Sequence, residues 1–256
     1  MQIEVLELLA REAPLFQLKS GERGLSSAEG LFLEQGGTET SRFERASAAL
    51  PAESLSVMDR LLRPDHVTLE VGGGHSTVLF AASVANHYCV NPDKTANRLI
   101  REFMESHGLW RDNLCFIEES SDHALPRFEA EDEIDVALLD GNHSFPFPML
   151  EWHYVDRKLR RGGWLIVDNV EITAVRMLCE FLRSEPAYRL VEKARGSHRY
   201  DCHVYEKVAD QVVSGWSAQG INHSSLMRLS LDASITNLWK PLQRLRRRIA
   251  PRKSDR

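Results

Sequence analysis

The feature that most constrains the fold is a short apolar segment that runs into three consecutive glycines. Val67–Val71 is rich in β-branched and aliphatic residues, as is typical of a buried strand. Gly72–Gly74 follows, and the apolar run from Ser76 to Ala82 predicts a helix with Ser76 as its N-cap. Glycines allow a tight turn and the close approach of a ligand to the main chain. The pattern therefore predicts a strand–turn–helix unit with a ligand at the turn.

Two well-known glycine motifs do not fit this turn. A dinucleotide-binding loop needs a third glycine where this chain has Thr77, and a P-loop needs a Gly-Lys-Ser/Thr ending that is absent. What remains is an acid-x-Gly-x-Gly pattern formed by Glu70, Gly72 and Gly74. A glycine-rich turn in an unrelated α/β protein would show the same pattern, so the turn alone does not identify the ligand.

Strands and helices alternate after the turn. Further strands are predicted at 87–91, 114–118, 134–140 and 164–168, and helices at 76–86, 93–107, 122–128, 149–159 and 172–182. Gly162 and Gly163 are interpreted as the end of the helix over 149–159. Strands at 188–193 and 202–207 have no helix between them and should form an antiparallel hairpin. The sequence thus predicts an α/β fold with a doubly wound, mostly parallel seven-stranded sheet and a C-terminal antiparallel hairpin.

Composition excludes several classes of protein. The formal net charge of -5 gives no reason to expect nucleic-acid binding. The four cysteines lack C-x-x-C spacing, which suggests neither a zinc site nor a disulfide framework. No apolar run approaches the ~18 residues needed to span a bilayer, and the N-terminus lacks the apolar region of a secretory signal. We expect a cytoplasmic protein.

The chain divides into three predicted parts. Residues 1–49 form a helical and loop extension that could act as a lid, and residues 50–208 form the α/β domain. Residues 209–256 are a basic, partly helical extension. A basic amphipathic helix can lie on an anionic membrane surface, and it can equally be a solvated tail. We favour the solvated tail.

The glycine turn and the order of the predicted strands resemble the class I S-adenosylmethionine (SAM) methyltransferases, over roughly residues 50–208. In that family the glycine loop lies against the methionine part of SAM, and an acid after the second strand binds the ribose hydroxyls. Asn91 stands at that position here, and its amide oxygen is a weaker acceptor than a carboxylate. The resemblance implies that the cofactor-binding residues are Glu70, Gly72, Gly73, Gly74, His75, Ser76, Asn91, Ser121 and Asp140.

Acids also end the fourth and fifth predicted strands. Asp140 precedes Gly-Asn-His143, and Asp168 precedes Asn169. If these strands are neighbours, their axes lie ~4.8 Å apart, so the two carboxylates point at one place and repel each other. A hard divalent cation would remove the repulsion, and oxygen ligands favour Mg²⁺, Ca²⁺ or Mn²⁺. Alternatively, Asp140 only positions a cofactor or substrate and Asp168 caps the next helix.

These strand ends resemble the metal-dependent small-molecule O-methyltransferases of the catechol and macrolide-sugar types. The resemblance implies Asp140, Asp168 and Asn169 as metal ligands. His143 is the candidate general base, because imidazole titrates near ~6.5 and the sugar-modifying type has a histidine at this spacing. Together with Asp140 it forms the predicted catalytic pair. His143 could instead hydrogen-bond a loop carbonyl. The segment 145–148 could wall an apolar acceptor pocket.

The predicted function is transfer of a methyl group from SAM to a hydroxyl of a small molecule or sugar, with a divalent cation such as Mg²⁺. One alternative is a metal-independent O- or N-methyltransferase of the same fold. Another is a SAM-binding module that has lost catalysis, for which Asn91 is the only hint. The identity of the acceptor and the oligomeric state do not follow from the sequence.

Overall fold

The computed structural model describes residues 2–11, 50, 52–195, 201–210, 219 and 221. The chain divides into two compact units, residues 1–213 and 214–256, and the elements below belong to the first. Most of the predicted lid and the basic C-terminal segment lie outside the described residues. Within the described part, no helix is both long and apolar enough to cross a bilayer.

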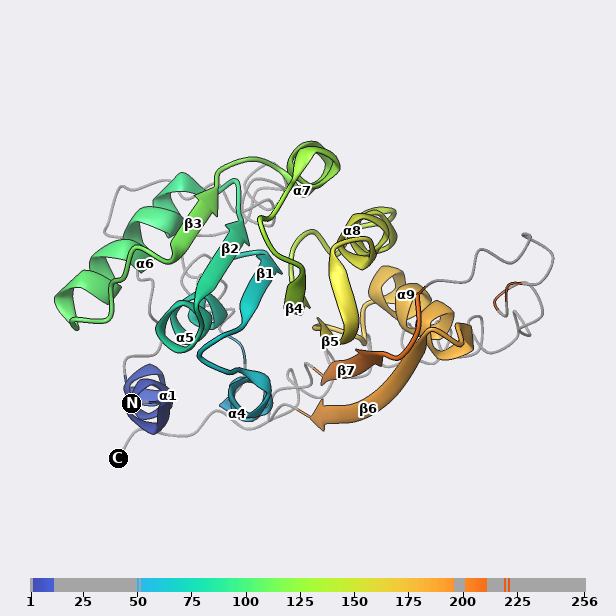
Figure 1. Ribbon diagram of the computed structural model, residues 1–256, viewed down its shortest axis with the longest axis horizontal. Coiled ribbons are helices and arrows are strands. Elements are labelled where there is room, and N and C mark those ends of the chain that lie inside the picture. The colour runs from blue at the N-terminus through green and yellow to red at the C-terminus, as the bar shows by residue number, and fades with distance from the viewer. Residues whose placement is uncertain are drawn as a thin grey trace, which may run out of the picture. The chain divides into compact units, whose positions relative to one another are not determined.

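The described strands form one seven-stranded sheet with the order β3-β2-β1-β4-β5-β7-β6 (Figure 1). The strands are β1 (Val67–Val71), β2 (Asn86–Val90), β3 (Leu114–Ile117), β4 (Ile134–Leu139), β5 (Leu159–Val167), β6 (Tyr188–Arg195) and β7 (Asp201–Lys207). The first five strands pair in parallel, and β7 is antiparallel to both β5 and β6. The predicted doubly wound sheet and its closing hairpin are confirmed.

Helices cover both faces of the sheet. They are α1 (Gln2–Arg11), α4 (Ala52–Leu61), α5 (His75–Ser83), α6 (Lys94–Ser106), α7 (Ser121–Ala124), the 3₁₀ helix η1 (Leu125–Arg127), α8 (Phe147–Asp156) and α9 (Thr173–Ser184). The group α1, α4, α5 and α6 packs on one face, and α7, α8 and α9 pack on the other (Figure 1). All nine residues of α5 are buried, since it contacts β2, α1, α4 and α6. Its middle, Val78–Ala82, is entirely apolar, as such a central helix requires.

The predicted end of one helix is wrong. The helix predicted over 149–159 ends at Asp156 as α8, and β5 already begins at Leu159. Leu159 pairs with Ile134 and Trp164 pairs with Val136, so residues 160–163 form a bulge in β5. Gly162 has a φ of 78° in this bulge. A glycine in the left-handed region is used both at helix ends and in strand bulges, and here it serves the bulge.

Candidate functional site

The predicted site residues gather at the carboxyl ends of the parallel strands. Gly72 follows β1, Asn91 follows β2, Asp140 follows β4 and Asp168 follows β5. The backbone N–H of each donates to a carbonyl of the neighbouring strand, at 2.9–3.1 Å. Each residue is therefore held in register one step beyond its strand. The strand order reverses between β1 and β4, which is where ligands bind in open α/β sheets.

The carboxylate of Glu70 supports the glycine turn from inside the protein. Glu70 is fully buried, and its Oε1 accepts a hydrogen bond from the Thr77 hydroxyl. The same oxygen lies 3.2 Å from Nε2 of His87, whose Nδ1 is 2.8 Å from the hydroxyl oxygen of Thr68. The Thr77 oxygen in turn accepts from the N–H of Gly74 at 2.9 Å. This chain of contacts fixes the turn, while direct contact between Glu70 and a cofactor stays a prediction.

We expect Thr77→Val to destabilise the protein by about 2 kcal/mol. The substitution keeps the shape of the side chain, but it leaves both the buried Glu70 carboxylate and the Gly74 N–H without the Thr77 hydroxyl. Urea unfolding of the variant and the parent protein measures the loss. Thr173→Val, at an exposed position in α9, is the control and should change the free energy of unfolding by less than about 0.5 kcal/mol. Equal stability of Thr77→Val and the control would contradict this role.

The three glycines of the turn meet different surroundings. Gly72 has a φ of 90°, and a Cβ there would lie 2.1 Å from the carbonyl oxygen of Asp140. A Cβ on Gly73 would lie 2.7 Å from Nδ2 of Asn91, whereas a Cβ on Gly74 would meet no atom within 4 Å. Gly72 and Gly73 are thus needed for packing within the protein. Gly74 leaves open space beside the main chain, as a ligand would require.

Three other predicted cofactor residues are also placed by the structure. His75 and Ser76 begin α5 and are buried, and burial lowers the pKa of His75 to about 4, so its imidazole is neutral at pH 7. The Asn91 amide donates to Oδ1 of Asn97 at 2.8 Å and accepts from the N–H of Asp93 at 3.3 Å. These bonds fix the loop after β2. The predicted contact of Asn91 with a ribose stays a prediction.

Asp140, His143 and Asp168 lie together at the ends of β4 and β5. The Nε2 of His143 is 3.4 Å from Oδ1 of Asp140. Burial acts to lower the pKa of His143, but the neighbouring Asp140 outweighs it, so the pKa is raised. Asp168 is only 3% exposed, and burial followed by the charge of Asp140 raises its pKa to about 9. The structure thus brings the two predicted carboxylates within electrostatic reach of each other.

The glycine turn and the residues after β4 lie in a segment that matches a known protein family. Residues 69–170 match a protein family described as a methyltransferase domain. This segment of the chain is therefore similar to a methyltransferase domain. No curated protein matches the chain at a significant level.

The α/β fold that contains this segment is similar to several solved structures. One is a putative O-methyltransferase from Klebsiella pneumoniae, with a TM-score of 0.54 and 18% identity, covering 81% of this chain and 90% of that chain. Another is the O-methyltransferase TomG from Streptomyces achromogenes in complex with SAM, with a TM-score of 0.54 and 16% identity over 81% and 99% of the two chains. A third is an rRNA methylase from Streptococcus thermophilus, with a TM-score of 0.52 and 13% identity over 63% and 99%. These likenesses show the class I methyltransferase fold and leave the acceptor open.

The donor set at the ends of β4 and β5 is chemically suited to a hard cation. Oδ1 of Asp168 is buried and has no hydrogen-bond partner among the residues that the structure describes. Asn169 follows with a φ of 55°, in the left-handed region. In the described part of the chain, no group of three or more His, Cys, Asp or Glu side chains could hold a metal ion. The predicted set has two carboxylates and one amide, and its role as a metal site stays a prediction.

Sequence reasoning missed two carboxylates of this region. Glu151, on α8, is buried, accepts a hydrogen bond from the Ser121 hydroxyl at 2.7 Å, and has a pKa raised by burial to about 7. Glu171 acts on both Asp168 and His143 electrostatically, and burial raises its own pKa. An acid within the apolar start of α8 was a visible signal for Glu151. Nothing comparable marks Glu171.

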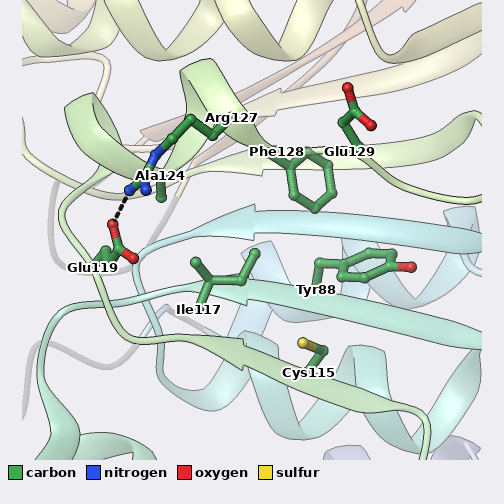
Figure 2. Close-up of a pocket in the computed structure, with 8 residues that line it drawn as sticks. All are labelled: Tyr88, Cys115, Ile117, Glu119, Ala124, Arg127, Phe128 and Glu129. Carbon is green, nitrogen blue, oxygen red and sulfur yellow. Dashed lines mark hydrogen bonds and ion pairs between the residues drawn. The ribbon is translucent and has the colours of Figure 1, made fainter.

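A pocket of about 330 Å³ lies apart from these residues, between the sheet and the α7–η1 segment (Figure 2). It is lined by Tyr88, Cys115, Ile117, Glu119, Ala124, Arg127, Phe128 and Glu129. The rings of Tyr88 and Phe128 meet edge to face, and Arg127 pairs with Glu119 at the rim (Figure 2). None of the predicted site residues lines this pocket.

Proposed function

We propose that the chain is a SAM-dependent O-methyltransferase that acts on a hydroxyl of a small molecule or sugar with the help of a divalent cation. The observation that carries the proposal is the buried carboxylate of Asp168 beside Asp140, at the same end of the sheet as the glycine turn. The likeness to TomG and to the Klebsiella protein supports an oxygen acceptor. The net charge of -5 favours a small acceptor over a nucleic acid.

The glycine turn fits the proposed cofactor. The open space at Gly74 lets a ligand approach the main chain, while Gly72 and Gly73 are closed off by the protein itself. SAM supplies a methyl group that is already activated on a sulfonium. The task left to the protein is to align the acceptor oxygen with that methyl group, which can contribute ~7–11 kcal/mol through positioning alone.

His143 is the proposed general base. The acceptor oxygen forms its bond to the methyl carbon as the carbon–sulfur bond breaks, and His143 takes the hydroxyl proton. Nε2 lies 3.4 Å from Oδ1 of Asp140, so in this role Nδ1 would be the nitrogen that accepts the proton. Phe145, two residues further along the chain, is 68% exposed and would offer an apolar surface to the acceptor.

Asp140, Asp168 and Asn169 would hold the divalent cation. Bound there, the cation would make an acceptor hydroxyl easier to deprotonate and would fix its direction. The two carboxylates would then be neutralised together, which removes the repulsion that adds to burial in raising the pKa of Asp168.

We expect SAM-dependent methylation of a hydroxylated acceptor that EDTA slows at least tenfold and Mg²⁺ restores. The measurement is methyl transfer from radiolabelled SAM to a panel of phenols, catechols and sugars, alongside calorimetry with S-adenosylhomocysteine (SAH). Unchanged rates in EDTA would favour a metal-independent enzyme. SAH binding without any product would favour a non-catalytic SAM-binding module, and the absence of SAH binding would contradict the proposal altogether.

A further inference from the structure

A buried acid outside the predicted catalytic set connects two loops of the methyltransferase domain. Glu151 lies on α8, which packs against both α7 and β4, and its side chain is buried. A buried carboxylate without hydrogen bonds would be strongly unfavourable. Glu151 therefore has to be explained by the groups that it contacts.

One of these groups belongs to the turn after β3. Ser121, the first residue of α7, is buried and donates its hydroxyl hydrogen to Oε1 of Glu151 at 2.7 Å. The residues are 30 positions apart, so the bond joins two separate segments. The hydroxyl of Ser121 is thus directed at Glu151 and ties the turn after β3 to α8.

The other contacts belong to the loop after β4. The carboxylate of Glu151 accepts a hydrogen bond from the backbone of Asn142, the residue before His143. A Cβ on Gly141 would lie 2.9 Å from Oε1 of Glu151 and 2.6 Å from Cγ1 of Val71 at the end of β1. The loop is thus packed closely between β1 and the carboxylate of Glu151.

We propose that Glu151 is a positioning residue of the methyl-donor site, which holds the turn after β3 and the loop after β4 at a fixed separation. The inference rests on the proposed function, because Ser121 and Asp140 are predicted to flank SAM. A turn that is already fixed needs no ordering when the cofactor binds, and pre-organisation of this kind raises affinity. Loss of the Glu151–Ser121 bond should therefore weaken cofactor binding about tenfold.

A double-mutant cycle on the full chain tests this role, with SAH binding measured by calorimetry. We expect Ser121→Ala and Glu151→Ala each to raise the dissociation constant of SAH about tenfold. The double variant should bind no more weakly than Glu151→Ala, because both substitutions break the same bond. Glu151→Gln keeps an amide oxygen that can accept from Ser121, so it should bind SAH within about threefold of the parent protein. Glu102→Ala, at an exposed carboxylate on α6 paired with Arg98, is the control and should bind normally.

The possible results separate this inference from the proposed function. If the parent protein fails to bind SAH, the proposed function fails. If the parent binds and both alanine variants bind as tightly as the parent, or if their losses add in the double variant, the positioning role is overturned. A loss in Glu151→Gln as large as that in Glu151→Ala would also overturn it, because that variant retains the acceptor. Should Glu151→Ala not fold, Ser121→Ala and Glu151→Gln still decide the question.

Discussion

Gly72→Ala should destabilise the protein by on the order of 3 kcal/mol and abolish measurable SAH binding. The added Cβ would lie 2.1 Å from the carbonyl oxygen of Asp140, which is backbone and cannot turn aside as a side chain could. The φ of 90° is also unfavourable for any residue with a Cβ. Relief requires the end of β1 and the end of β4 to separate, which displaces Asp140. Thermal unfolding and SAH calorimetry measure the two effects.

Gly74→Ala is the matched control for this prediction. A Cβ there meets no protein atom within 4 Å, so the stability should change by less than about 0.5 kcal/mol. If the open space is where SAM lies, the same methyl group should weaken SAH binding at least tenfold. Loss of stability in Gly74→Ala, or normal stability in Gly72→Ala, would contradict the distinction drawn between the two glycines.

The order of elements could be predicted because several strands are short runs rich in β-branched and aliphatic residues. Val67–Val71 and the segment before Asp140 are examples, and both are strands in the structure. The missing helix between the last two strands was enough to predict their antiparallel pairing. Gly162 and Gly163 were misplaced because a positive φ is needed in both a helix end and a strand bulge, and a local window does not distinguish the two.

The positions of site residues could be predicted only where the order of the strands determines them. Asp140 and Asp168 are neighbours because β4 and β5 pair, a consequence of the parallel order. The partners of His87 and Glu151 could not be predicted, because each lies on a different element from the side chain that it contacts. A pattern of local periodicity carries no information on contacts between residues 17 or 30 positions apart. Those contacts are set by packing.

We expect Asp168→Asn to lower methyl transfer at least a hundredfold while SAH affinity stays within about threefold of the parent value. The substitution keeps the size of the side chain but removes the charge that the proposed cation needs. Asp168 follows β5, whereas the glycine turn follows β1, so the cofactor contacts should persist. Methyl transfer at saturating SAM and SAH calorimetry separate the two quantities. A large loss of SAH affinity would contradict the role assigned to Asp168.

The same substitution should make the protein more stable in EDTA. The folded-state pKa of Asp168 is raised to about 9 from an ordinary value of 3.8, so the folded state binds this proton more tightly than the unfolded state does. The contribution of Asp168 to the free energy of unfolding is therefore fully present below about pH 4, and it is lost as the pH rises toward 9. At pH 8 Asp168→Asn removes that loss, and its Tm should exceed that of the parent by about 5 °C.

Mg²⁺ should raise the Tm of the parent and not that of the variant, since the cation would stabilise only the protein that holds both carboxylates. Equal Mg²⁺ effects on both proteins would show that Asp168 is not a ligand.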